Sequence, residues 1–223
     1  MRGVQGRVLV LGPLGLAVAA GVGVALVYAL FVGTNAGRAV DDFLVDNLDE
    51  GGWERGADAV VGAFNFITVP VLGAVIVATA LGSGGPATAL RVVVLIVGAS
   101  LTARGLEELL GTIDPLGAES ERDLGSGFYP SGHAAVIASL CLAAVLAAPP
   151  RCRRQVAAGA AGAAAILLGW ALPVGGSHHP SDVLGGALVA LGWAAVCWRR
   201  GGSQTGPESR HFFRWPSVSG RMI

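Results

Sequence analysis

Residues 8–32 read VLVLGPLGLAVAAGVGVALVYALFV, an apolar run without a single charged side chain. Arg2 and Arg7 stand in front of it. A cleavable signal peptide would have a shorter apolar region followed by a small-residue cleavage site. This run exceeds the roughly 20 residues that a helix needs to cross a bilayer. It therefore predicts a retained transmembrane helix.

The composition of the whole chain is that of a membrane protein. Of 223 residues, 53% are hydrophobic and only 13% are charged, about half the charged share of a typical soluble domain. The formal net charge is zero, so no overall positive field favours nucleic acid as a partner. Cys141, Cys152 and Cys197 are isolated, without a CxxC pair. A disulfide framework is therefore not expected.

Five further apolar segments follow the first, separated by polar stretches or by turns rich in glycine and proline. They cover approximately residues 59–81, 90–110, 130–148, 156–172 and 181–198. Several are rich in glycine and alanine, which lets helix backbones approach closely within a bilayer. The pattern predicts an all-α polytopic membrane helix bundle with about six transmembrane helices.

Charge and hydropathy divide the chain into four parts. We expect an N-terminal transmembrane helix at 1–33, an outer acidic loop at 34–58, a membrane core at 59–199 and a cytoplasmic tail at 200–223. The acidic stretch is most simply a solvated loop or a short interfacial helix.

The distribution of arginine predicts the orientation in the membrane, because short cytoplasmic loops carry an excess of basic residues. With six spans, both termini share one side. The arginines near span ends on that side are Arg2, Arg7, Arg91, Arg151, Arg153, Arg154, Arg199 and Arg200. The other side has Arg38, Arg55, Arg104 and Arg122, and most of the acidic residues. We therefore expect a multi-pass protein of the cell membrane with cytoplasmic termini, and loops 34–58, 111–130 and 173–180 outside.

The first candidate catalytic motif, PSGH, lies at the outer end of the fourth segment. Pro130 suits the first helical position, where its missing N–H costs nothing. Ser131, Gly132 and His133 would then form the first turn, whose free amides and helix dipole favour an anion. His133 would face the same space and transfer a proton.

The second motif lies at the outer start of the sixth segment, in Ser177-His178-His179-Pro180-Ser181-Asp182. Asp182 would lie within the first helical turn and reach back to His178. It would fix the tautomer of that imidazole and leave the other ring nitrogen free to attack. An anion site, an oriented nucleophile and a second histidine are the groups that phosphoryl transfer through a phosphohistidine requires.

The pairing of PSGH with HxxxD in a six-span chain resembles the type 2 phosphatidic acid phosphatase (PAP2) superfamily. The resemblance implies that His178 is the nucleophile, that Asp182 orients it and that His133 protonates the leaving alcohol. It also implies that Ser131 and Gly132 contact phosphate oxygens, and that no cofactor is needed. His179 is expected to be an interfacial residue.

The chain departs from the family at three cationic positions. In the family's first motif, KxxxxxxRP, Glu107 stands at the lysine position and Asp114 at the arginine position. In the third motif, which normally begins Ser-Arg, Ala171 and Leu172 occupy those two positions. Such cations stabilise phosphate charge in the transition state.

Two substitutes for the missing cations are open. Arg104, one turn before Glu107, and Arg122 in the outer loop would bind phosphate directly. Alternatively, a divalent cation would be held by carboxylates and histidines, namely Glu107, Asp114, His133, His178 and Asp182. A solvated helix end is the simpler interpretation of Glu107.

The sequence thus predicts an enzyme of lipid metabolism, a phosphatase that acts on a phosphomonoester or diphosphate of a lipid at the outer face. Polyprenyl diphosphate, phosphatidic acid and phosphatidylglycerol phosphate are the candidate substrates that the resemblance implies, and membrane lipids are the other expected partners. The alternative is a catalytically inactive PAP2-fold protein that binds lipid or assists membrane assembly. A transporter is less consistent with the sequence, because no inverted repeat is visible and the ionisable residues lie at span ends. A vanadate site of the haloperoxidase type would need the same missing cations.

Overall fold

The computed structural model describes residues 12–48, 52–111, 129–175 and 178–198, and within these ranges the chain is helical and has no strand. Several residues considered above lie outside the described ranges, namely Arg2, Arg7, Asp114, Arg122, Ser177, Arg199 and Arg200, together with the tail at 200–223. The described part confirms the predicted all-α membrane bundle.

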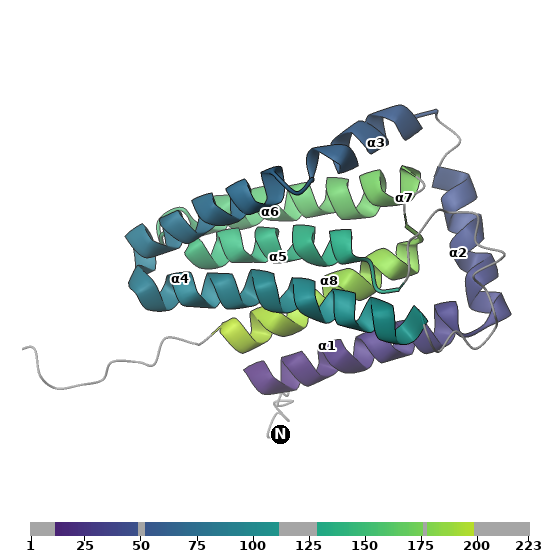
Figure 1. The fold of residues 1–223 in the computed structure, drawn as a ribbon, viewed down its shortest axis with the longest axis horizontal. Coiled ribbons are helices and arrows are strands. Elements are labelled where there is room, and N and C mark those ends of the chain that lie inside the picture. The colour runs from purple at the N-terminus through teal and green to yellow at the C-terminus, as the bar shows by residue number, and fades with distance from the viewer. Residues whose placement is uncertain (1–11, 49–51, 112–128, 176–177, 199–223) are drawn as a thin grey trace, which may run out of the picture.

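The long helices lie side by side along the long axis of the molecule (Figure 1). They are α1 (Pro13–Val27), α4 (Thr68–Gly111), α5 (Gly132–Ala147), α6 (Arg153–Ile166) and α8 (Pro180–Cys197). The helix α5 lies among α4, α6 and α8 and contacts all three. The shorter α2 (Asn35–Leu48) crosses the end of the bundle where α5 and α8 begin (Figure 1).

Helix α4 contains two of the predicted spans, joined by a sharp turn. Gly85 inside it has φ 72° and ψ −173°, a conformation that glycine adopts without steric cost and other residues rarely adopt. Pro86 follows, and its ring cannot continue a preceding helix. The two halves of α4 therefore double back on each other (Figure 1). This turn lies between the predicted apolar segments 59–81 and 90–110, where the sequence is rich in glycine and ends in proline.

The second span begins later than the sequence indicated. Residues 54–63 form the separate helix α3 (Glu54–Ala63), and α4 starts only at Thr68. Between them, the side-chain oxygen of Asn65 accepts the backbone N–H groups of Ile67 and Thr68 at 2.9 and 3.1 Å. This local turn satisfies amides at the new helix start and ends the preceding helix. The expected continuous span over 59–81 is thus wrong in its first turns.

Two spans contain π-helical turns. The helix α1 continues through η1 (Tyr28–Val32), and α6 continues through η3 (Leu167–Ala171) into the short α7 (Leu172–Val174). Both π-helical segments lie at the end of the bundle that carries α2. The segment η1 contacts α2 directly, and η3 leads into α7, which also contacts α2. The predicted fifth span, 156–172, therefore reaches from Arg153 to Val174.

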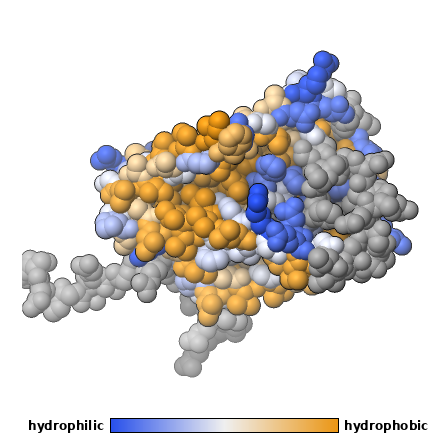
Figure 2. Space-filling model, in the orientation of Figure 1, coloured by the Kyte–Doolittle hydropathy of each residue, from blue (hydrophilic) through white to orange (hydrophobic). Residues whose placement is uncertain are grey.

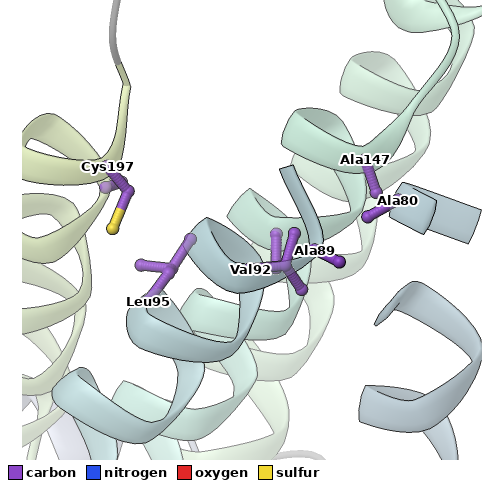
Figure 3. Packing of buried hydrophobic residues seen from close by; sticks show 8 residues of the cluster. Ala80, Ala89, Val92, Leu95, Ala147 and Cys197 are labelled. Carbon is purple, nitrogen blue, oxygen red and sulfur yellow. The ribbon is translucent and has the colours of Figure 1, made fainter. Parts of the chain in front are cut away.

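Small residues form much of the core between helices. Figure 3 shows one cluster in which Val92 and Leu95 of α4 lie near Cys197 of α8, with Ala80 of the first half of α4 beside Ala147 of α5. The small side chains of Ala80 and Ala147 let their helix backbones approach closely, which favours packing in a bilayer. The three cysteines are free, and Cys197 is buried whereas Cys152 is exposed.

The outer surface of the bundle is apolar. Among the described residues, four helical segments are long and apolar enough to cross a membrane, and one of them is the doubled α4. Large side chains such as Leu14, Leu101 and Ile166 are exposed along them. Hydrophobic residues form a broad band across the helices, and hydrophilic residues gather at the end that carries α3 (Figure 2). Such a band is what lipid contact requires.

Candidate active site

The two predicted motifs meet at one end of the bundle, where α5 and α8 begin. The Ser131 N–H donates a hydrogen bond to the Asp182 carbonyl at 2.9 Å, which joins the two helix starts through their backbones. Gly186 of α8 permits this approach, because a Cβ added there would lie 2.4 Å from the Ser131 carbonyl oxygen. The sequence order alone did not reveal this contact, although the Gly185-Gly186 pair is a signal of close backbone approach.

The side chains of His133 and His178 face each other across this junction. Nε2 of His178 lies 3.4 Å from Nδ1 of His133, and the ring centroids are 5.7 Å apart. His178 is 7% exposed, whereas His133 is exposed. One buried and one accessible imidazole therefore share a single small space.

The environment of His178 favours its neutral form. Burial lowers the pKa of His178 to about 4, the nearby Asp182 carboxylate opposes this shift, and His133 and His179 add to it. A neutral imidazole has a free lone pair for attack. Nδ1 of His178 is buried and has no hydrogen-bond partner among the described residues. Nε2, which faces His133, is therefore the nitrogen positioned for chemistry.

The start of α5 differs from the expected arrangement by two residues. Ser131 is the N-cap, and its hydroxyl oxygen accepts the Ala134 N–H at 3.1 Å, so Pro130 precedes the helix instead of opening it. The Ser131 amide is already used by the bond to α8. Within the described residues, the first-turn amides of Gly132 and His133 have no acceptor, and these two remain for an anion.

Asp182 occupies the predicted first turn of α8 but contacts a different histidine from the one expected. Its Oδ2 accepts the His179 backbone N–H at 3.2 Å and lies 3.7 Å from Nδ1 of the same residue. No hydrogen bond from Asp182 to His178 is present in the described part of the chain. At 0% exposure, Asp182 acts on His178 through its charge and through the backbone geometry of 178–182.

His179 is not the interfacial residue that we expected. It is 4% exposed and is the N-cap residue of α8, with Pro180 at the first helical position. Its Nε2 lies 3.1 Å from Oδ1 of Asp42, and its Nδ1 faces Asp182. The imidazole thus lies between two carboxylates, one from α2 and one from α8.

Helix α2 is the part of the site that sequence reasoning missed. Of the two alternatives for 34–58, a loop or a short helix, the described residues form α2 and the start of α3. Asp41 is 1% exposed and contacts Ser181 at the start of α8. The apolar residues Val40 and Phe43 of α2 are exposed instead. By hydropathy, Val40 and Phe43 would be buried and Asp41 exposed, so no signal in a single sequence indicated a buried Asp41.

Glu107 lies beside the start of α5. Its Oε2 is 3.9 Å from the position of a Cβ built on Gly132, so a carboxylate is next to the turn that carries the free amides. Arg104 is exposed on the same helix, close enough to influence the Glu107 carboxylate. Ala171 and Leu172, at the positions of the third-motif Ser-Arg, are fully buried among apolar residues.

Only some of the residues proposed to replace the missing cations lie within the described ranges. Asp114 and Arg122 lie outside the described residues. Within the described ranges, no three histidine, cysteine, aspartate or glutamate residues are grouped as a metal site would need. A direct role of Arg104 and a metal at Glu107 and Asp114 both stay predictions.

Comparison with known proteins gives one match. The family model of the PAP2 superfamily matches residues 87–204, a region that holds both histidine motifs and the second half of α4. Neither the curated proteins nor the solved structures that were searched gave a match.

Proposed function

The chain belongs to the PAP2 superfamily, and on that premise we propose that it is a membrane phosphatase that removes a phosphate group from a lipid at the outer face of the cell membrane. The observation that carries the proposal is the pair of facing histidines, with Nε2 of His178 and Nδ1 of His133 3.4 Å apart at two joined helix starts. A phosphorus atom placed over this junction would have a nucleophile and an acid within reach.

In the proposed reaction, the lone pair of His178 Nε2 attacks phosphorus and the bond from phosphorus to the leaving oxygen breaks. His133 gives its proton to that oxygen, so the product leaves as a neutral alcohol or a lipid monophosphate. Water then attacks the phosphohistidine, with His133 taking a proton from it. Inorganic phosphate leaves, and both histidines return to their starting states.

Burial of Nδ1 supports this assignment of the attacking nitrogen, since that atom has no access to substrate. The amides of Gly132 and His133 would donate to the phosphate oxygens, and the dipole of α5 adds to their effect. Asp182 keeps the 178–182 backbone in place through the His179 amide. Arg104 and Arg122 are the chain's own candidates for further positive charge.

A lipid substrate fits the position of the site. The histidines lie at the end of a bundle whose surface is apolar along its length. A substrate whose hydrocarbon chain stays in the bilayer would present its headgroup at that end. The excess of arginine at the opposite end, including Arg151, Arg153 and Arg154, supports an extracytoplasmic site with cytoplasmic termini.

Phosphate release by the purified chain in detergent tests the proposal. Polyprenyl diphosphate, phosphatidic acid and phosphatidylglycerol phosphate would each be assayed with magnesium and with a chelator. We expect release from at least one substrate, and its loss in His178→Ala. If phosphate is released with magnesium but not with the chelator, a metal ion takes the role of the missing cations. Full release by His178→Ala would exclude this mechanism.

One observation favours a second function, a PAP2-fold protein that binds lipid phosphate without turnover. Glu107 places a carboxylate beside the anion-binding turn at the lysine position of the family motif. Absence of phosphate release from every substrate, together with saturable binding of one of them to the wild-type protein, would support that alternative.

A further inference from the structure

Two acidic residues of α2 contact the first turn of α8, and the proposed mechanism uses neither. Oδ1 of Asp41 accepts the Ser181 N–H at 3.2 Å, and its Oδ2 accepts the proton of the Ser181 hydroxyl. Asp42 follows and contacts His179. These bonds tie α2 to residues on both sides of Pro180, directly after the proposed nucleophile His178.

The carboxylate of Asp41 is unusually well buried for an acidic side chain. The side chain is 1% exposed, so its carboxylate has lost most of its contact with water. Burial raises the pKa of Asp41, and the two hydrogen bonds from Ser181 oppose the shift. A polar group hidden in this way is costly unless its hydrogen bonds are made. Satisfied buried polar contacts favour one specific arrangement of the groups that they join.

We propose that Asp41 is a positioning residue, which holds the His178 segment in its catalytic geometry through its two hydrogen bonds to Ser181. Helix α2 is then part of the catalytic scaffold, although it lies outside the 87–204 region of the family match. The catalytic consequence rests on the proposed phosphatase function, whereas the contact itself does not.

The route from Asp41 to His178 is short and stiff. Ser181 is separated from His178 by His179, whose backbone is extended at φ −72° and ψ 153°, and by Pro180, whose ring fixes φ. Asp182 holds the His179 amide from within α8. Asp41 contacts this segment from outside that helix, at the residue that follows Pro180. A shift of about 1 Å in a reacting group costs up to about 100-fold in rate, so loss of this contact affects turnover more than affinity.

Three variants separate the roles of hydrogen bonding, charge and general helix stability. Asp41→Ala removes both acceptors and leaves the Ser181 amide unsatisfied. Asp41→Asn removes the charge but keeps an oxygen for the amide and an NH₂ group that donates to the hydroxyl. Asp46→Ala removes an exposed carboxylate from the same helix and is the matched control.

We expect Asp41→Ala to lower kcat by about 10- to 100-fold, with KM close to the wild-type value. Asp41→Asn is expected to restore most of kcat, and Asp46→Ala to leave both constants unchanged. Because Asp41 acts through Ser181, adding Ser181→Ala to Asp41→Ala is expected to cost little more. An unchanged kcat in Asp41→Ala, or fully multiplicative effects in the double variant, would overturn the proposal.

Amide hydrogen exchange tests the contact without turnover. Peptides that cover residues 178–183 are expected to exchange faster in Asp41→Ala than in the wild type. Their exchange rate in Asp41→Asn is expected to be lower than in Asp41→Ala. Should Asp41→Ala fail to fold, Asp41→Asn and Ser181→Ala give the same comparison. A wild-type chain without phosphatase activity would refute the proposed function, and faster exchange would still support the contact. Equal exchange in all variants would overturn the contact in either case.

Discussion

At the scale of single residues, burial and charge act in opposite directions on His178. Burial dominates and lowers its pKa to about 4, against the effect of Asp182. An imidazole with that pKa is neutral throughout the physiological range, so its lone pair is available without an external base. In the proposed mechanism, the readiness of His178 to attack thus comes mainly from its place in the fold.

This pKa predicts the acid limb of the pH–rate profile. Since protonation of His178 blocks attack, kcat/KM should hold as pH falls through 6.5 and decline only as pH approaches 4. The measurement is the pH dependence of phosphate release, between pH 3.5 and 7.5, in a detergent that keeps the chain folded over that range. Asp182→Asn removes the opposing charge and should move the limb to still lower pH. A limb centred near the ordinary histidine value would contradict the environment described for His178.

The residues also show what a single sequence reveals about a site. His133, His178 and Asp182 were predicted from motif spacing, because a helix start imposes a local geometry that spacing encodes. The partner of Asp182 was not predictable, since His178 and His179 are adjacent and only the extended backbone at His179 decides which one the carboxylate meets. Asp41 was missed because its partner, Ser181, is 140 residues away in the chain.

At the scale of helices, glycine on α8 sets the distance between the two motifs. A Cβ on Gly186 would lie 2.4 Å from the Ser131 carbonyl oxygen and 2.9 Å from Cβ of Ala134. Both contacts are too short, and the backbone atom cannot move without moving α5. The separation of the histidines therefore depends on the absence of one methyl group.

Gly186→Ala should accordingly separate the starts of α5 and α8. We expect a loss of about 1–3 kcal/mol in stability and a larger fall in activity than in thermal stability. Gly162→Ala on α6 is the control, because nothing lies within 4 Å of its added Cβ. That control should be neutral or stabilise by up to about 1 kcal/mol. Thermal unfolding and phosphate release on both variants check this, and equal behaviour of the two would refute the packing argument.

The existence of the helices was predictable, but several of their ends were not. Long apolar runs and the turn at Gly85 and Pro86 indicated the two halves of α4 because they reflect bilayer thickness and backbone sterics. The break at 64–67 depends on one side chain, Asn65, that caps a new helix. In α2, hydropathy did not indicate which face is buried, since Phe43 is exposed and Asp41 is buried.

At the scale of the whole molecule, the end that carries the proposed site and the arginine-rich end are opposite. The histidines lie with α2 at one end, and the turn between α5 and α6, which carries Arg151, Cys152 and Arg153, lies at the far end of those helices. The positive-inside rule predicts a cytoplasmic turn, and the proposed site would then lie outside.

Native Cys152 makes this orientation measurable, because it is exposed in that turn while Cys197 is buried. A membrane-impermeant maleimide added to intact cells should leave Cys152 unlabelled, and should label it once the cells are opened. An Asp46→Cys variant in a Cys152→Ser background should show the reverse pattern, with labelling in intact cells. Labelling of Cys152 from outside would invert the topology and the proposed location of the site.

The central claim is that phosphate passes through a covalent bond to His178. The most direct test is the transfer of radioactive phosphate from a labelled lipid substrate to the purified protein, followed by mapping of the labelled peptide. We predict label on His178 in the wild type and none on the protein in His178→Ala. Phosphate release by the wild type with the label never on His178, or label retained in His178→Ala, would contradict the account.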